Sequence, residues 1–314
     1  MSAKPEATRD AYGRALITLG ETRPDVVVLD ADLSKSTKTA SFAAKYPDRF
    51  FNVGIAEADL MGTACGLALA GLKPFASTFA IFATGRAYDQ VRNSVTYASL
   101  PVVIAATHAG LTVGPDGGSH QSIEDIALMR VLPGMQVWVP ADGEEAYQMI
   151  LAAAEVTAGP VYVRLGRQPV PRVVPAGYVF TPGKACVLGD AAPVAIIACG
   201  VMVEASLQAA LLLKQRGINC QVVNMSSIKP LDTATLASVA QNSELIVTVE
   251  EHLVAGGLGS ACAESLAAAK SRPPLVMVGV KDRFGQSGEP QELLAAYELT
   301  AEHIAARIER ALSR

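Results

Sequence analysis

A stretch without charged residues runs from Leu60 to Leu72, shortly after an acid, Glu57. Its length and apolar character predict a helix packed on other protein, because a membrane span needs ~20 apolar residues. Glu57 then lies in the first turn, where the helix dipole favours a negative charge. A buried carboxylate without a partner would sooner take up a proton, so we expect Glu57 to face a group that donates or shares a hydrogen. A solvated first-turn glutamate is the alternative.

Short apolar runs alternate with helical patterns along the chain. This alternation predicts the α/β class, with two doubly wound domains whose sheets are mostly parallel. We expect strands at residues 26–30, 50–53, 73–79, 102–107, 135–139, 161–165, 194–198, 220–224, 245–249 and 275–278. The proline-rich stretch from Gln168 to Pro182 has no periodicity and predicts a linker. The predicted limits are 5–170 for the first domain, 171–185 for the linker and 186–314 for the second domain.

The amino-acid composition indicates which kinds of molecule the protein binds. Only 18% of the residues are charged, against a usual ~25%, so we expect an oligomer in which other chains cover part of the surface. A net charge of −4 argues against nucleic acid and anionic membranes as partners. The five cysteines lie in apolar segments without CxxC spacing, which predicts reduced thiols, no zinc site and a cytoplasmic location. Neither an export signal nor a membrane span is expected.

Two of the four histidines lie in a glycine-rich loop, Thr107–Gln121, that directly follows a predicted strand. Loops of this kind carry function more often than cores do, so His108, Asp116 and His120 are candidate functional residues. A metal site formed by these three is one alternative, although the glycines break any helix that would align the last two. A loop folded on its own hydrogen bonds is the other.

Further candidates lie near the ends of other strands. Phe79 and Phe82 are three residues apart at a strand-to-helix corner, where a flat heterocycle could stack. Arg9 lies in the first helix, Ser36 in a polar loop after strand 26–30, and Arg167 just past strand 161–165. Carboxyl ends of strands are where open α/β sheets bind ligands, although by spacing alone each arginine would be a surface charge.

The segments GIAEADLMGTACGLALAG (54–71) and PFASTFAIF (74–82) resemble the pyrimidine-binding domain of thiamine-diphosphate enzymes, most closely that of transketolases. The second domain resembles the transketolase C-terminal domain. The resemblance implies that Glu57 hydrogen-bonds a ring nitrogen of the aminopyrimidine, and that Phe79 and Phe82 pack on this ring. A carboxylate that shares a proton with the ring acts in acid–base catalysis.

The loop with the two histidines is similar to the substrate loop of transketolases. The resemblance implies that His108 and His120 contact substrate oxygens and act in catalysis, and that Asp116 binds a sugar hydroxyl. It further implies that a sugar phosphate is surrounded by four residues: Arg9, Ser36, His108 and Arg167. The implied reaction transfers a two-carbon ketol unit from a ketose phosphate to an aldose phosphate.

Long transketolases carry a Gly-Asp-Gly motif followed at a distance by Asn, which hold the metal and the diphosphate. The present chain has no such motif, because Gly189-Asp190 is followed by Ala191. The resemblance therefore implies the C-terminal subunit of a split transketolase. A separate N-terminal subunit would hold the diphosphate of thiamine diphosphate and Mg²⁺ or Ca²⁺, so no metal ligand is expected in this chain. We expect a heterotetramer with this partner, with a homodimer as an option for the isolated chain.

Other functions on the same fold are alternatives. A deoxyxylulose-phosphate synthase-like subunit and the beta subunit of a 2-oxo acid dehydrogenase share the fold and the glutamate, but the paired histidines and Thr8-Arg9 favour transketolase. A non-catalytic scaffold subunit would need neither Glu57 nor the histidines.

The segment Val249–Gly259 has glycines before a helix, as phosphate-binding loops do. It lacks the lysine of a P-loop, so helix capping and a subunit contact are the expected roles. No chemistry is assigned to Glu250, Glu251 or His252.

Overall fold

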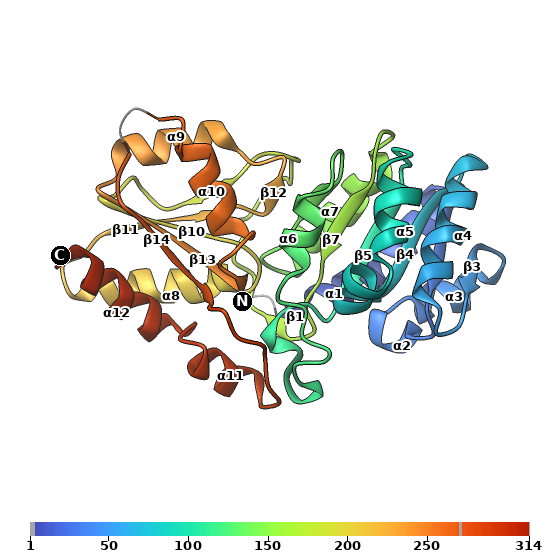
Figure 1. Ribbon diagram of the computed structural model, residues 1–314, viewed down its shortest axis with the longest axis horizontal. Coiled ribbons are helices and arrows are strands. Elements are labelled where there is room, and N and C mark those ends of the chain that lie inside the picture. Colours follow the sequence, from blue (N-terminus) through green and yellow to red (C-terminus); the bar gives the residue numbers. More distant parts are fainter. Residues whose placement is uncertain (1–3, 270–271, 314) are drawn as a thin grey trace.

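The computed structural model describes residues 4–269 and 272–313 and has two parts, each built on one large sheet (Figure 1). The first sheet has seven strands in the order β12-β6-β7-β5-β4-β2-β3, and only the pair of β12 and β6 is antiparallel. Its strands are β2 (Val26–Asp30), β3 (Phe50–Asn52), β4 (Lys73–Phe79), β5 (Val103–Thr107), β6 (Gln136–Trp138), β7 (Val161–Arg164) and β12 (Ser227–Lys229).

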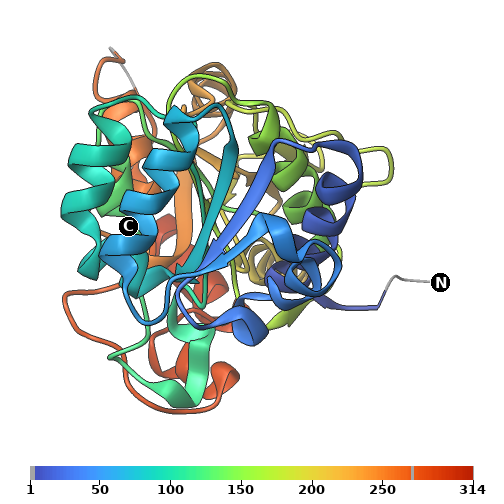
Figure 2. The ribbon, with the colours of Figure 1, turned by 90° about the vertical axis from the view of Figure 1, so that its right-hand side faces the viewer.

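Helices cover both faces of this sheet (Figure 2). Val26 and Val28 pack against one set of helices, and Val27 and Leu29 against the other, because successive side chains of a strand point to opposite faces. The first set is α1 (Thr8–Thr22), α3 (Ala40–Lys45) and α7 (Gly143–Glu155). The second set is α4 (Glu57–Leu69), α6 (Asp125–Arg130) and the π-helical segment η3 (Val91–Thr96). The shorter helical segments of this part are α2 (Ser34–Thr37), η1 (Pro47–Arg49), η2 (Phe82–Arg86), α5 (Tyr88–Gln90) and η4 (Leu111–Asp116).

The second sheet has five strands in the order β14-β13-β10-β11-β9, with β9 antiparallel at one edge. Its strands are β9 (Cys186–Leu188), β10 (Val194–Ala198), β11 (Cys220–Asn224), β13 (Leu245–Leu253) and β14 (Leu275–Val280). Its helices are α8 (Met202–Gln215), α9 (Thr233–Asn242), α10 (Leu258–Leu266), α11 (Pro290–Ala296) and α12 (Ala301–Leu312). The predicted fold, two doubly wound α/β units with mostly parallel sheets, is confirmed.

Several strands differ from the sequence prediction, and β9 and β12 are absent from it. β12 pairs with β6 across the boundary between the predicted domains, so a segment from the second half extends the first sheet. β13 continues through Glu250, Glu251 and His252, which were expected to precede a helix as a loop. A two-stranded pair, β1 (Glu6–Ala7) with β8 (Pro169–Val170), joins the N-terminal segment to the end of the first part. One hydrophobic core runs through both parts, from Leu60 to Leu258.

The predicted linker, residues 171–185, contains no helix or strand. It is nevertheless attached to the first part, because the carboxylate of Asp142 accepts hydrogen bonds from the backbone amides of Val173 and Val174 at 2.7 and 2.9 Å. Phe180 also packs edge-on against Trp138, with ring centroids 5.1 Å apart. The exact domain limits remain a prediction.

The charge-free stretch of α4, from Leu60 to Leu69, is buried on one side only within this chain. Leu60, Met61 and Ala64 lie in the core, whereas Gly62, Gly66 and Leu69 face outward. The absence of charge therefore reflects an exposed apolar face as well as a buried one. All five cysteines are free thiols, although Cys186 and Cys220 are only half-buried. Within residues 4–269 and 272–313, no helix has the length and hydropathy needed to cross a membrane.

Candidate functional site

Glu57 is the first residue of α4, and its side chain is almost completely buried, at 3% exposure. Gly54 has a φ of 74° in the turn before it, a conformation that glycine adopts without strain. The Oε1 atom of Glu57 accepts a hydrogen bond of 2.9 Å from Nη1 of Arg86. The hydrogen donor that the sequence predicts for Glu57 is therefore an arginine of the same chain.

Arg86 was not found from the sequence. It ends a π-helical segment, η2 (Phe82–Arg86), that directly follows β4, and Ala87 donates its amide hydrogen to the carbonyl of Phe82, five residues earlier. The Arg86 guanidinium lies over the Phe82 ring, 4.3 Å from its centroid, and the side chain is 53% exposed. Nothing in the sequence signals a π turn, although such turns are frequent at functional sites. Only the arginine end of this ion pair is exposed, so a ligand could displace Arg86 if it donates a hydrogen bond to the buried Glu57 carboxylate in its place.

Four side chains from separate segments form one group, which we call the aromatic cluster: Phe79, Phe82, His108 and His120. Phe79 stacks on His108 with ring centroids 3.8 Å apart and lies nearly parallel to Phe82 at 5.8 Å. His120 meets the Phe79 and Phe82 rings edge-on at 6.3 and 5.6 Å. The corner after β4 and the glycine-rich loop, which the sequence analysis treats as independent motifs, therefore contribute to one site beside Glu57.

His108 follows β5 in a left-handed conformation, with φ 58°. Its Nε2 lies 3.0 Å from Nη1 of Arg9, and its Nδ1 lies 2.9 Å from the hydroxyl of Thr107. Because arginine only donates, Nε2 accepts, and Nδ1 therefore carries the proton and donates it to Thr107. Burial, together with the positive charges of Arg9 and Arg167, lowers the His108 pKa to about 3. The structure holds this imidazole neutral, in one tautomer.

The predicted phosphate-binding residues surround the same place. Nη1 of Arg9 also donates to the backbone carbonyl of Ser36 at 3.2 Å, so Ser36 contributes its carbonyl to this contact. Burial lowers the pKa of Arg9, and the nearby charge of Arg167 adds to this shift. Arg167 donates to the carbonyl of Val113 at 3.0 Å and to Asp116 at 3.3 Å. Two guanidinium groups therefore converge beside the aromatic cluster, and Asp116 is the counter-ion of one of them.

A buried acid, Asp30, shapes the segment after β2, in which Ser36 lies in the short helix α2 and not in the predicted loop. Its carboxylate accepts the amide hydrogen of Leu33 at 2.6 Å and the hydroxyl hydrogens of Thr37 and Thr39 at 2.6 and 2.9 Å. Burial raises the pKa of Asp30. This network fixes the position of the Ser36 carbonyl at the end of β2, next to Arg9.

Within the part of the chain that the structure describes, no group of three His, Cys, Asp or Glu side chains could hold a metal ion. His108 and Asp116 instead contact Arg9 and Arg167.

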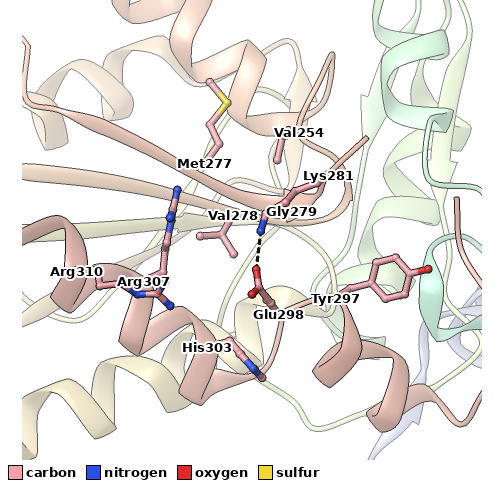
Figure 3. A pocket seen from close by; sticks show the side chains of 10 residues that line it. All are labelled: Val254, Met277, Val278, Gly279, Lys281, Tyr297, Glu298, His303, Arg307 and Arg310. Carbon is pink, nitrogen blue, oxygen red and sulfur yellow. Dashed lines mark hydrogen bonds and ion pairs between the residues drawn. The ribbon is translucent and has the colours of Figure 1, made fainter. Parts of the chain in front are cut away.

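A cavity of about 280 Å³ lies in the second part, between β14 and α12 (Figure 3). Lys281 and Glu298 form an ion pair of 2.6 Å in its wall. Its lining includes none of the site residues predicted from the sequence.

Comparison with known proteins identifies the two parts. Residues 4–172 match the family model of the transketolase pyrimidine binding domain, and residues 183–304 match that of the transketolase C-terminal domain. A protein of Methanocaldococcus jannaschii described as a transketolase C-terminal section is 44% identical over 98% of this chain and 97% of its own length. A 6-deoxy-6-sulfo-D-fructose transketolase subunit of Clostridium sp. is 40% identical over 94% of this chain and 91% of its own. A 1-deoxy-D-xylulose-5-phosphate synthase of Synechococcus sp. is 39% identical over 97% of this chain but only 47% of its own.

Solved structures agree. A split-gene transketolase, described as an inactive β4 tetramer, has a TM-score of 0.89 and 51% identity and is covered over 99% of both chains. A transketolase of Pichia stipitis in complex with sedoheptulose 7-phosphate has a TM-score of 0.84 and 26% identity, and this chain spans 46% of it. The present chain thus spans about half the length of the longer relatives. It belongs to the transketolase family and contains that family's pyrimidine-binding and C-terminal domains.

Proposed function

We propose that this chain is the C-terminal subunit of a thiamine-diphosphate-dependent transketolase, which transfers a two-carbon ketol unit from a ketose phosphate to an aldose phosphate. In this proposal it is active only with a separate N-terminal subunit. The observation that carries the proposal is the convergence of the buried Glu57, the aromatic cluster and the pair Arg9 and Arg167 in one site.

The residues present fit the pyrimidine end of the cofactor. A buried carboxylate beside Phe79 and Phe82 offers a hydrogen-bond acceptor next to apolar rings, which suits a nitrogen heterocycle. Thiamine diphosphate, when bound, supplies the carbanion chemistry. The proposed task of Glu57 is to hold a proton at a ring nitrogen, and Arg86 would first leave the carboxylate.

Sugar phosphates are the proposed substrates. Arg9 and Arg167 would hold the phosphate, with the loop of Ser36 and with His108 beside them. His108 and His120 would contact substrate oxygens, and Asp116 a sugar hydroxyl. A neutral imidazole can accept a hydrogen bond from a substrate hydroxyl, but Nε2 of His108 becomes available only when Arg9 turns to the phosphate. Guanidinium groups also bind sulfonates, and the Clostridium relative is named for a sulfonated sugar, so sulfonated sugars belong among the tested substrates.

The proposed partner holds the diphosphate and Mg²⁺ or Ca²⁺, and the proposed assembly is a heterotetramer in the cytoplasm. Support comes from the relative described as a C-terminal section and from the structural relative described as an inactive β4 tetramer. By the same comparison, we propose that the isolated chain forms an inactive homo-oligomer, either a homodimer or a tetramer like that relative.

The test is reconstitution. The chain, the candidate N-terminal subunit, thiamine diphosphate and Mg²⁺ are mixed and assayed for ketol transfer, with each component omitted in turn. We expect activity in the full mixture alone. Tight stoichiometric cofactor binding by this chain alone, or ketol transfer without the partner, would contradict the proposal.

A deoxyxylulose-phosphate synthase is the second candidate, because relatives of that name are 35% to 39% identical. The same mixture decides between the two. Release of CO₂ from pyruvate would favour the synthase, and turnover of a ketose phosphate without pyruvate would favour the transketolase.

A further inference from the structure

The end of β13 carries three consecutive polar residues that the proposed reaction does not use. Glu250, Glu251 and His252 are each at most 3% exposed. Glu250 accepts hydrogen bonds from the amides of Leu258 and Gly259 at 2.7 and 2.8 Å, so it caps α10 within its own part. Glu251 and His252 instead contact the first part of the molecule.

The Glu251 carboxylate reaches the substrate loop, which we define as Gly110–Gln121. Its Oε1 accepts the amide hydrogen of Thr112, a residue that is 1% exposed. Gly110, with φ 81°, allows this approach, because a Cβ there would lie 2.4 Å from the carboxyl group. Arg164 donates to the backbone carbonyls of Glu251 and of Ser122, at 3.0 and 3.2 Å, and so fastens β13 to the end of the same loop.

A second segment of the same part, residues 284–290, holds the loop from another side. The Nε2 of Gln121 donates to the carbonyl of Leu111 at 3.1 Å within the loop and to the carbonyl of Gln286 at 2.9 Å across the boundary. A Cβ at Gly285 would lie 1.8 Å from Oε1 of Gln121, and one at Gly118 would lie 2.7 Å from the carbonyl of Gly285. The segment and α11 lie beside the loop in two perpendicular views (Figures 1 and 2).

The loop held in this way carries proposed ligand-binding groups. It contains Asp116 and His120, and its Val113 carbonyl accepts a hydrogen bond from Arg167. We propose that the C-terminal part positions the substrate loop through Glu251 and through the contact of Gln121 with Gly285-Gln286, so that Glu251 and Gln121 are positioning residues for substrate. The inference rests on the proposed function for the identity of the ligand, but the dependence of the loop on Glu251 can be tested without it.

The first test uses the full chain alone. Hydrogen exchange of residues 110–121 is compared by mass spectrometry in the unmutated chain, Glu251→Ala and Glu250→Ala. Both variants remove a buried carboxylate of β13 that accepts backbone amides, but only Glu251 contacts the loop. We expect exchange in the loop to become roughly five- to hundredfold faster in Glu251→Ala and to stay within twofold in Glu250→Ala. Equal exchange in the two variants would overturn the inference.

The second test uses the mixture with the N-terminal subunit. Glu251→Ala and Gly285→Ala should raise the KM for sugar phosphate roughly five- to hundredfold, with kcat changed less, whereas the affinity for thiamine diphosphate stays within twofold. Glu251→Gln retains an acceptor for the Thr112 amide and should restore most of the KM. A loss of cofactor affinity equal to the rise in KM, or no rescue by Glu251→Gln, would reduce Glu251 to a residue of general stability. An inactive unmutated mixture would instead refute the proposed function, while the exchange test still decides whether Glu251 holds the loop.

Discussion

The carboxyl edges of the two sheets both carry polar side chains at the ends of parallel strands. In the first sheet these side chains form the candidate site, and in the second they join the two parts of the molecule. At the edge of the first sheet, β4 ends in Phe79 and His108 follows β5, beside a half-exposed Arg86 that covers Glu57. At the edge of the second sheet, β11 ends in Asn224 and β13 in Glu250–His252, and all of these side chains are buried. Asn224 donates to both carboxylate oxygens of Glu145 in α7, at 3.0 Å each, which joins the two parts.

This difference shows that the carboxyl ends of the strands supply polar side chains in both sheets. Whether these side chains can bind a ligand or only stabilise the fold depends on the residues that pack against them. In the first sheet the groups face one another around an arginine pair that a ligand can rearrange. In the second sheet their hydrogen bonds go to backbone groups and to the first part, so they stabilise and position.

The largest expected effect is the loss of ketol transfer when a buried acid of the first edge is replaced, compared with a buried acid of the second edge. Glu57→Gln should lower ketol transfer in the reconstituted mixture by ~10²- to 10⁴-fold, because an amide cannot hold a proton at a ring nitrogen. Melting temperature and assembly should hardly change, since the amide has the same size. Steady-state rates and calorimetry measure both quantities.

Glu250→Gln is the matched control, because it changes an equally buried acid of the second edge. We expect it to lower the melting temperature and to keep most of the rate. If Glu57→Gln kept full activity, Glu57 would be only a carboxylate at a helix terminus, and the two edges would not differ in function.

The next effect concerns the arginines of the first edge. Arg167→Ala should raise the KM for phosphorylated donors by ~10- to 150-fold, which corresponds to the ~1.5–3 kcal/mol of a lost charge-assisted contact. An unphosphorylated ketose donor should be affected far less. Equal losses for the two kinds of donor would show that Arg167 supports the loop through the Val113 carbonyl and Asp116 and does not bind phosphate.

A third prediction uses pH, because each edge holds a neutral histidine. The pKa of His108 is lowered to about 3 and that of His252 to about 4, mainly by burial. The unfolded chain, with a histidine pKa near 6.5, binds more protons than the folded chain below that pH, so stability falls as the pH falls from about 6.5 toward these values. Each histidine should cost about 2 kcal/mol of unfolding free energy between pH 7 and pH 5.

Urea unfolding of the isolated chain at several pH values measures this cost. His108→Asn and His252→Asn should each flatten the pH dependence, whereas only His108→Asn should also impair ketol transfer in the mixture. An unchanged pH dependence in His108→Asn would mean that this imidazole has the same pKa in the folded and the unfolded chain.

The smallest effect concerns the ion pair over Phe82. Arg86→Gln should tighten thiamine diphosphate binding in the mixture by up to ~5-fold, since the cofactor no longer has to displace the half-exposed guanidinium from Glu57. Cofactor titrations of activity measure the change, and Arg92→Gln, an exposed arginine further along the same segment, serves as control. Weaker binding in Arg86→Gln would mean that Arg86 remains in place and contacts the cofactor itself.

Much of the fold follows from local patterns. The strands 26–30, 73–79, 194–198 and 220–224 have the predicted limits. The apolar runs in 26–30 and 194–198 are typical of strands buried on both faces. The start of a helix at Glu57 also follows from the turn at Gly54 and the apolar run after it. The residues matched to the family motifs lie together as the resemblance implied, although their roles stay predictions.

Only the tertiary structure decided which strands pair with each other and which group binds each buried polar side chain. Three contacts join segments that no periodicity or spacing in the sequence connects. They are the pairing of β12 with β6, the ion pair of Arg86 with Glu57 and the hydrogen bond that the Thr112 amide donates to Glu251. The physical reason is that a sequence specifies which groups need a partner, as the buried acid Glu57 does, whereas the choice of partner depends on how whole sheets and helices pack. Glu57 and Glu251 are both buried acids that look alike in the sequence, and packing alone left one beside a displaceable arginine and bound the other to the backbone of a neighbouring loop.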